Sequence, residues 1–183
     1  MSPAHGCEEP ILRPETVSDI RGVHQLNRRA FSESELGYGG EAELVDRIRS
    51  SEKATLSLVA EQDGRVVGHI LFTSVEIDGS ELEIEGASLG PMAVVPELQG
   101  QGIGTRLVNE GLQRLKERGV PFVAVLGHPE YYPRFGFQPS AQFGVRCEFE
   151  GVPAEAFMLV ALDPKVPIPD GVARYLPEFS DAT

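Results

Sequence analysis

Cysteine and long apolar runs are both scarce in this chain. Cys7 and Cys147 are the only cysteines among 183 residues, and a chain of this size reaches a stable core without a disulfide. We therefore expect a reducing, cytoplasmic location. No apolar run approaches the roughly 18 residues of a membrane-spanning helix, and residues 1–10 lack the basic start and apolar segment of a secretory signal. These absences argue against a membrane or secreted protein.

Positive charge is scarce as well. Lys and Arg number 16 against 28 Asp and Glu, which gives a formal net charge of −12. Binding to a nucleic-acid backbone depends on clustered Lys and Arg, so nucleic acid is not expected as a partner. The acidity suits a cationic amine substrate, but acidity that merely keeps the protein dissolved is the favoured explanation. Cysteines and histidines are scattered without metal-site spacing, so no metal is expected.

The chain length and the spacing of apolar residues predict one α/β domain over residues 11–163. Residues 1–10 are expected to form a flexible tail, and the proline-containing residues 164–183 an extended arm. Asp63-Gly64 and Asp78-Gly79 predict hairpin turns, so the sheet begins with antiparallel hairpins. Helices are expected after residue 18 and at 41–50, 103–118 and 129–134, and strands at 11–14, 55–61, 65–75, 87–95, 120–126, 144–148 and 156–161.

The most informative segment runs from Met92 to Glu110. An apolar strand leads to Pro96, which cannot continue a hydrogen-bonded ladder. The glycine-spaced turn 99–104 follows, and a helix begins directly after it. Glycines let the backbone approach a ligand closely, and the first N–H groups of a helix lie unpaired at the positive end of its dipole. Strand, turn and helix start together predict a phosphate-binding site.

Two common phosphate-binding motifs do not fit this turn. A P-loop has Gly-Lys-Ser/Thr at the helix start, whereas this chain has Gly104-Thr105-Arg106. A dinucleotide-binding fold has a third glycine and an acidic residue at the end of the next strand. Here Leu107 stands in place of the glycine, and the next strand is followed by Gly127-His128. Both nucleotide motifs are therefore excluded.

Two motifs, separated by one helix and one strand, point to a different family. The first is Val94-Val95-Pro96 followed by Gln99-x-x-Gly102-x-Gly104. The second is Tyr132, which lies four residues before Gly136-Phe137. In both motifs and in their order the chain resembles the GNAT superfamily of N-acetyltransferases, with single-domain bacterial members. The resemblance extends over roughly residues 11–162, most of the chain.

The resemblance implies the GNAT fold: a mixed, mostly antiparallel sheet with a splayed pair of parallel strands and flanking helices. It implies acetyl-CoA as cosubstrate, with the pantetheine arm between the splayed strands against Met92, Ala93 and Val94. Tyr132 matches the family tyrosine that faces the thioester sulfur, so it is the expected proton donor to the leaving thiolate. The pyrophosphate is expected at the turn and helix start, on Gln99, Gly100, Gln101, Gly102, Ile103, Gly104 and Thr105.

The other candidate groups for catalysis are less clear. Tyr131 competes with Tyr132, but adjacent helical residues point about 100° apart, so one of them at most is expected to face the sulfur. Residues 88–91 contain no carboxylate where many GNAT enzymes have one, so the base stays open between a water-mediated route and His128. His69 lies in an apolar strand and is expected to be a core histidine.

Several charged residues have a plain surface interpretation. Glu81, Glu83 and Glu85 alternate along a strand and are expected on its solvated face. Arg106 and Arg134 either steady coenzyme phosphates or are ordinary solvated arginines.

Taken together, we expect an N-acetyltransferase that moves the acetyl group of acetyl-CoA to a primary amine by direct transfer in a ternary complex. The acceptor is a small molecule or a peptide, and no sequence feature identifies it. The alternative is a non-catalytic regulatory module that binds acyl-CoA, and a longer acyl donor also stays open. No membrane partner is expected, and the oligomeric state, a homodimer included, is left open.

Overall fold

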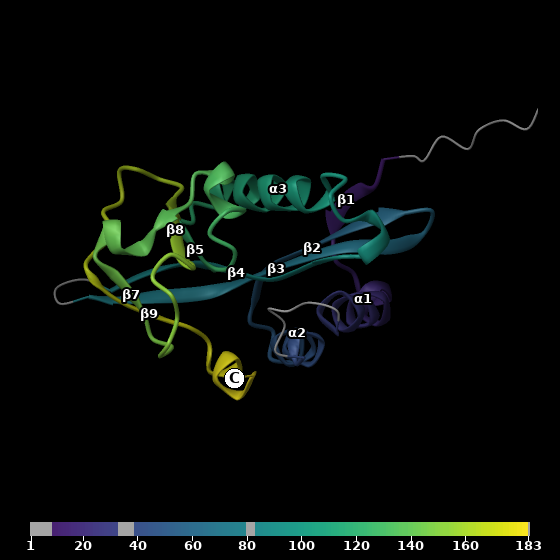
Figure 1. The fold of residues 1–183 in the computed structure, drawn as a ribbon, viewed down its shortest axis with the longest axis horizontal. Helices are drawn as coiled ribbons and strands as arrows, with labels where there is room; N and C mark the ends of the chain where they lie inside the picture. The colour runs from purple at the N-terminus through teal and green to yellow at the C-terminus, as the bar shows by residue number, and fades with distance from the viewer. Residues whose placement is uncertain (1–8, 33–38, 80–82, 183) are drawn as a thin grey trace, which may run out of the picture.

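The computed structural model describes residues 9–32, 39–79 and 83–182 (Figure 1). In this part of the chain nine strands form one sheet, whose main path runs β1-β2-β3-β4-β5-β8-β6 while β9 pairs with β3 and β7. The β4–β5 and β7–β9 pairs are parallel and the other pairs are antiparallel. The predicted mixed α/β fold class is confirmed. The strands are β1 Ile11–Pro14, β2 Ala54–Gln62, β3 Arg65–Gly79, β4 Glu83–Val94, β5 Phe122–Leu126, β6 Gln138–Pro139, β7 Val145–Cys147, β8 Phe157–Ala161 and β9 Gly171–Arg174.

Helices cover both faces of this sheet. Helices α1 (Ile20–Ser32) and α2 (Glu41–Ser50) lie on one face, and α3 (Ile103–Glu117) lies on the other (Figure 1). The first face buries Val23, Leu44 and Ile48 against Val59 and Leu71 of the sheet. These three residues lie on the apolar faces of α1 and α2, because residues three or four apart share one face of a helix.

Helix α3 packs unusually close to the sheet. Leu107 and Leu115 are fully buried in the main core beside Phe72 of β3. A Cβ atom at Gly111 would lie 2.4 Å from the ring of Phe72, which is closer than any side chain tolerates. Gly111 therefore lets the middle of α3 lie directly against the aromatic ring.

Strands β4 and β5 pair over a short stretch only. Their parallel register begins at Ala87 and ends at Leu89, which lies opposite Val125. Beyond it β4 continues along β3, and Gly90 adopts a φ of 146° at the point of departure. The edge of β4 that faces β5 thus has no strand partner after Leu89 within the described residues. The splayed parallel pair expected from the sequence is confirmed.

The C-terminal residues differ from the extended arm that their prolines suggested. Strand β9 pairs with β3 and β7, and the 3₁₀ helix η5 (Pro177–Ala182) packs against α2. Phe179 joins the core beneath α1 and α2, and Lys53 Nζ lies 2.9 Å from Glu178 Oε1. Four residues of strand surrounded by prolines give little sequence signal, because the pairing partner lies far away in the chain.

Other local predictions also need adjustment. The predicted helix at 129–134 is a short 3₁₀ helix, η3, over Tyr132–Phe135. Asp78 and Gly79 are the last residues of β3, and Glu81 lies outside the described residues. Glu83 and Glu85 are exposed, as expected for the outer face of a strand.

A series of hydrogen-bonded polar side chains, buried or half-buried, connects α1 and α2 to the sheet. Asn27 of α1 donates to Nδ1 of His69, at 3.2 Å, and the Nε2–H of His69 donates to Ser57 Oγ, at 3.0 Å. Ser57 donates in turn to Glu15, which also accepts from Arg49 of α2. His69 is fully buried, so the prediction of a core histidine is confirmed. Its register partner is Ala93 of β4.

The protonation states in this series follow from burial. Burial lowers the pKa of His69, against the raising effect of Glu15. Burial also opposes ionisation of Glu15, but the interactions with His69 and Ser57 outweigh it and lower the pKa of Glu15 to about 2. Neutral His69 has one acceptor and one donor nitrogen, and both are satisfied by the bonds described above.

We expect the free energy of unfolding to fall as the pH is lowered from 7 to 5. The unfolded chain binds a proton at His69 near the ordinary pKa of about 6.5, whereas the folded chain does not, so acid favours unfolding. The slope should approach about 1.4 kcal/mol per pH unit below that pKa. Urea unfolding of the wild type and of His69→Gln checks this, because the variant should have the flatter dependence. Equal slopes would contradict a neutral His69.

Candidate active site

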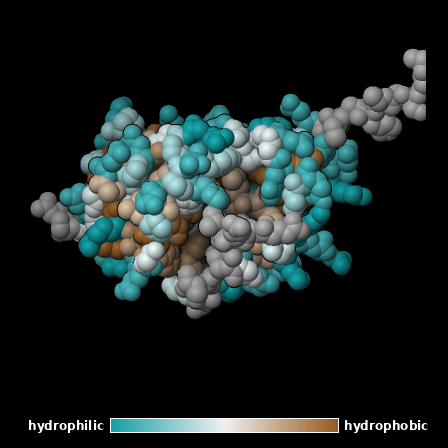
Figure 2. All heavy atoms as spheres, in the orientation of Figure 1, coloured by the Kyte–Doolittle hydropathy of each residue, from teal (hydrophilic) through white to brown (hydrophobic). Residues whose placement is uncertain are grey.

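A cavity of about 740 Å³ lies where β4 and β5 part. One side is formed by the end of β4, the glycine turn and the start of α3, and the opposite side by the segment after β5. Its far end reaches α1, α2 and the C-terminal segment. Figure 2 shows apolar side chains gathered in a hollow at the middle of this face, below α3. The volume suits a small-molecule ligand.

The glycine turn leaves open space at the start of α3. Gly100 and Gly102 have φ angles of 75° and 88°, and Cβ atoms built on them would meet nothing within 4 Å. Gly102 is the N-cap of α3, and no described side chain caps the helix. The N–H groups of its first turn therefore point at the open space with the positive end of the helix dipole behind them. This geometry fits an anionic group such as a phosphate.

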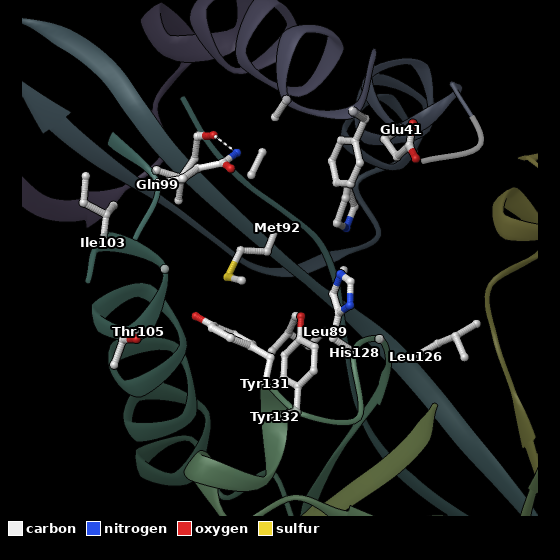
Figure 3. Close-up of a pocket in the computed structure, with 18 of the residues that line it drawn as sticks. Glu41, Leu89, Met92, Gln99, Ile103, Thr105, Leu126, His128, Tyr131 and Tyr132 are labelled. Carbon is white, nitrogen blue, oxygen red and sulfur yellow. Dashed lines mark hydrogen bonds between the residues drawn. The ribbon is translucent and has the colours of Figure 1, made fainter. Parts of the chain in front are cut away.

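The structure gathers nearly all residues predicted for coenzyme binding around this cavity. Gln101 is the exception, since it is exposed and its side chain donates to the Glu97 carbonyl, at 3.2 Å. Gln99 holds the turn to the strand by donating to the Val94 carbonyl, at 3.1 Å (Figure 3). Of the residues predicted to bind the coenzyme, those that line the cavity are Met92, Ala93, Val94, Gln99, Gly100, Gly102, Ile103, Gly104 and Thr105.

Tyr132 enters the cavity from the segment after β5, and Figure 3 shows it between Met92 and His128. Its ring packs edge-on against Phe137, with centroids 5.6 Å apart, and 7% of the residue is exposed. Burial is the main cause of a raised pKa for Tyr132. The hydroxyl therefore stays protonated at neutral pH and is available as a proton donor.

Tyr131 also lines the cavity. The expectation that one tyrosine at most faces the thioester sulfur stays a prediction. The two rings are nearly perpendicular, at 89°, and they reach different places. A Cβ atom built on Gly104 would lie 3.0 Å from the Tyr131 hydroxyl oxygen, so this hydroxyl lies at the first turn of α3. Figure 3 shows the same divergence of the two hydroxyl groups. The short 3₁₀ geometry after Tyr131 turns both side chains inward.

The two arginines considered from the sequence behave differently. The Arg134 guanidinium lies 4.6 Å from the Tyr131 ring centroid and its Nε donates to the Tyr131 carbonyl, at 2.9 Å, so it stays in the cavity lining. Arg106 instead donates to the Pro10 carbonyl, at 2.9 Å, and lies 3.7 Å from Glu9. Arg134 is thus the arginine that is placed for an anion in the cavity.

Comparison with known proteins identifies the family. The family model described as "Acetyltransferase (GNAT) domain" matches residues 12–140, which include both the glycine turn and Tyr132. The chain belongs to the GNAT acetyltransferase family. The Escherichia coli K12 protein named "Uncharacterized N-acetyltransferase YjhQ" is 42% identical to this GNAT chain over 126 residues, which are 68% of this chain and 67% of YjhQ.

Solved GNAT structures show the same fold. The Escherichia coli N-acetyltransferase YhbS in complex with CoA has a TM-score of 0.85 and 33% identity, and the match covers 98% of this chain and 95% of YhbS. A GNAT acetyltransferase of Brucella melitensis in complex with acetyl-CoA has a TM-score of 0.77 and 36% identity, with 93% and 97% covered. These relatives identify the GNAT chain as an acetyltransferase enzyme rather than a non-catalytic module.

Two ionisable groups that line the cavity had little sequence signal. Glu41, the first residue of α2, is 4% exposed and lines the cavity. Its position after Gly39-Gly40 marks a helix start, but only the tertiary fold brings that start to the cavity. His128 lines the cavity from the opposite side and is exposed (Figure 3). It therefore keeps its place among the candidate bases.

No cluster of three or more His, Cys, Asp or Glu side chains suited to a metal ion occurs in the described part of the chain. Over the same residues, no helix is long and apolar enough to cross a membrane.

Gly127 controls the position of Tyr132. A Cβ atom at Gly127 would lie 2.4 Å from Cε2 of the Tyr132 ring. We expect Gly127→Ala to displace the ring and to lower the free energy of unfolding by about 1–3 kcal/mol, the usual cost of overpacking. Chemical denaturation of the variant measures this. In a Tyr132→Ala background the ring is absent, so adding Gly127→Ala should cause no further loss in the free energy of unfolding. If the losses of the two single variants simply add in the double variant, a direct contact is contradicted.

Proposed function

We propose that this GNAT chain transfers the acetyl group of acetyl-CoA directly to a primary amine in a ternary complex. The supporting observation is that one continuous cavity includes the glycine turn, the protonated hydroxyl of Tyr132 and an open end away from the turn. Two ligands can therefore meet beside Tyr132 without a covalent enzyme intermediate. The relatives in complex with CoA and acetyl-CoA support the choice of cosubstrate.

Each part of the cavity has a role in this proposal. The first-turn N–H groups of α3 and the turn around Gly102 bind the pyrophosphate, and the free edge of β4 from Met92 to Val94 binds the pantetheine arm. Among the described residues, this path is lined by backbone and neutral groups apart from Arg134 at the cavity wall. Such a site aligns the thioester by shape and hydrogen bonds, which lowers the barrier by positioning.

The reaction adds one proton to the thioester sulfur and removes one proton from the amine nitrogen. The neutral amine nitrogen forms a bond to the thioester carbonyl carbon, the C–S bond breaks, and the sulfur takes a proton from the Tyr132 hydroxyl. The attacking nitrogen loses a proton, for which water or His128 is available at the cavity. The Tyr132 hydroxyl carries its proton at neutral pH, so it can pass that proton to the sulfur as the C–S bond breaks.

The pyrophosphate site is tested at Thr105, in the first turn of α3. An acid in this turn favours the helix dipole, so Thr105→Glu should fold normally while its charge repels the pyrophosphate. Acetyl-CoA at a hundredfold excess over its dissociation constant should stabilise the wild type by about 2.7 kcal/mol. We expect the matched neutral variant Thr105→Gln to keep most of this shift and Thr105→Glu to lose it. Equal thermal shifts for both variants would argue against a pyrophosphate at this helix start.

The proton donor is tested by Tyr132→Phe. Because the hydroxyl acts on the departing thiolate, its loss should lower kcat by roughly 10²-fold while the KM for acetyl-CoA stays close to the wild-type value. Tyr131→Phe should show the opposite pattern, a raised KM with kcat nearly retained, because its hydroxyl lies at the start of α3. An unchanged kcat in Tyr132→Phe, measured for the chemical step in single turnovers, would remove Tyr132 from the mechanism.

A further inference from the structure

The end of the cavity farthest from the glycine turn has a different lining. Phe31 of α1 and Leu44 of α2 approach it from one side, and Leu126 lies at the end of β5. Leu126 is 43% exposed, although the rest of β5 is fully or almost fully buried. An exposed leucine at a cavity is apolar surface that a ligand can cover. Three further side chains at this end are aromatic.

Three aromatic side chains from the last part of the chain form what we call the aromatic wall: Phe149, Tyr175 and Phe179. The Tyr175 ring centroid lies 5.2 Å from that of Phe149 and 5.5 Å from that of Phe179. Such edge-on and tilted contacts hold the rings in fixed orientations. All three residues line the cavity, so the wall presents aromatic surface to whatever enters beside Tyr132.

The charges at this end limit the kind of amine that fits. Among the described residues that line it, Glu41 is the carboxylate, and basic side chains are confined to His128 and Arg134 nearer the reaction centre. Glu41 already takes part in an interaction within the protein, so it is not assigned to the amine. Aromatic ring faces attract a single cationic group and cover the apolar body that carries it.

From this lining we propose that the acceptor is a small primary amine attached to an aromatic ring, an arylalkylamine, whose ring packs on the aromatic wall while its nitrogen reaches the thioester beside Tyr132. This inference rests on the proposed acetyl transfer for its reaction, but the binding of the amine does not. The nitrogen forms the bond to the acetyl carbon and releases its proton, and CoA leaves as the thiol, as described above.

A panel of amines tests the substrate class. With acetyl-CoA as donor, 2-phenylethylamine should have a kcat/KM at least about tenfold above that of n-butylamine, since added apolar groups in a fitted pocket gain about 10–200-fold. Spermidine should be no better than n-butylamine. A preference for spermidine, or equal values for the aromatic and aliphatic monoamines, would overturn the arylalkylamine assignment and leave acetyl transfer intact. Turnover of peptides alone would also overturn it.

Phe149 gives a matched test of the aromatic wall. Phe149→Ala should lower kcat/KM for 2-phenylethylamine at least about tenfold, the gain expected from a fitted apolar group, and should change the KM for acetyl-CoA little. The effect on n-butylamine should be much smaller. Phe143→Ala is the control, because Phe143 is a half-buried phenylalanine outside the lining of the cavity. The same loss for both amines, or the same loss in the control, would contradict a role for the aromatic wall in specificity.

Direct binding separates this inference from the proposed function. Calorimetric titration of 2-phenylethylamine into the CoA-loaded protein should show binding that Phe149→Ala weakens. If the amine binds in this way but no amine in the panel is acetylated, the proposed reaction fails and the binding site stands. If 2-phenylethylamine neither binds nor reacts, the arylalkylamine proposal is wrong, whatever the fate of other amines.

Discussion

The early end of the pairing between β4 and β5 is the constraint on which the rest of this structure depends. Backbone groups of a strand must find partners, and within the described residues β4 beyond Leu89 has a strand partner on one edge, β3, while the Val94 carbonyl also accepts from Gln99. The opposite edge stays available to a ligand that offers amide groups of its own. The gap also separates the start of α3 from the segment after β5, so the turn and the tyrosines face each other across a space.

Two buried ionisable side chains, Tyr132 and His69, are uncharged at neutral pH. Burial raises the pKa of the Tyr132 hydroxyl, which is protonated at neutral pH, and burial lowers the pKa of His69, which is uncharged there. The two groups serve different ends. The neutral histidine completes a chain of hydrogen bonds that attaches α1 and α2 to the sheet on the side of Ala93. The neutral tyrosine keeps a transferable proton in a place where charge is costly.

The parts of the site that lie close together in the sequence could be predicted, and those that assemble from a distance could not. Residues 92–105 form strand, turn and helix start in one run, so local rules for glycine and helix ends are enough to place them. Tyr132 was found through its spacing to Gly136-Phe137. Glu41 and the aromatic wall gave no such signal, because each reaches the cavity through a separate tertiary contact. Gln101 shows the limit of the motif itself, since a residue inside the turn faces solvent.

The short strand β9 has a consequence for how specificity can change. It pairs with β3, which lies nearly a hundred positions earlier in the chain, with Gly171 opposite Gly79. This pairing brings Tyr175 and η5 to the cavity, whose opposite side is formed by residues that precede η3 or belong to it. Ribosomal synthesis adds this segment after the turn, α3 and β5 have already emerged. In the proposed function, this part of the amine site is therefore encoded after the donor site. Under that proposal, mutation within the segment from β9 to η5 alters the choice of amine while the donor side stays unchanged.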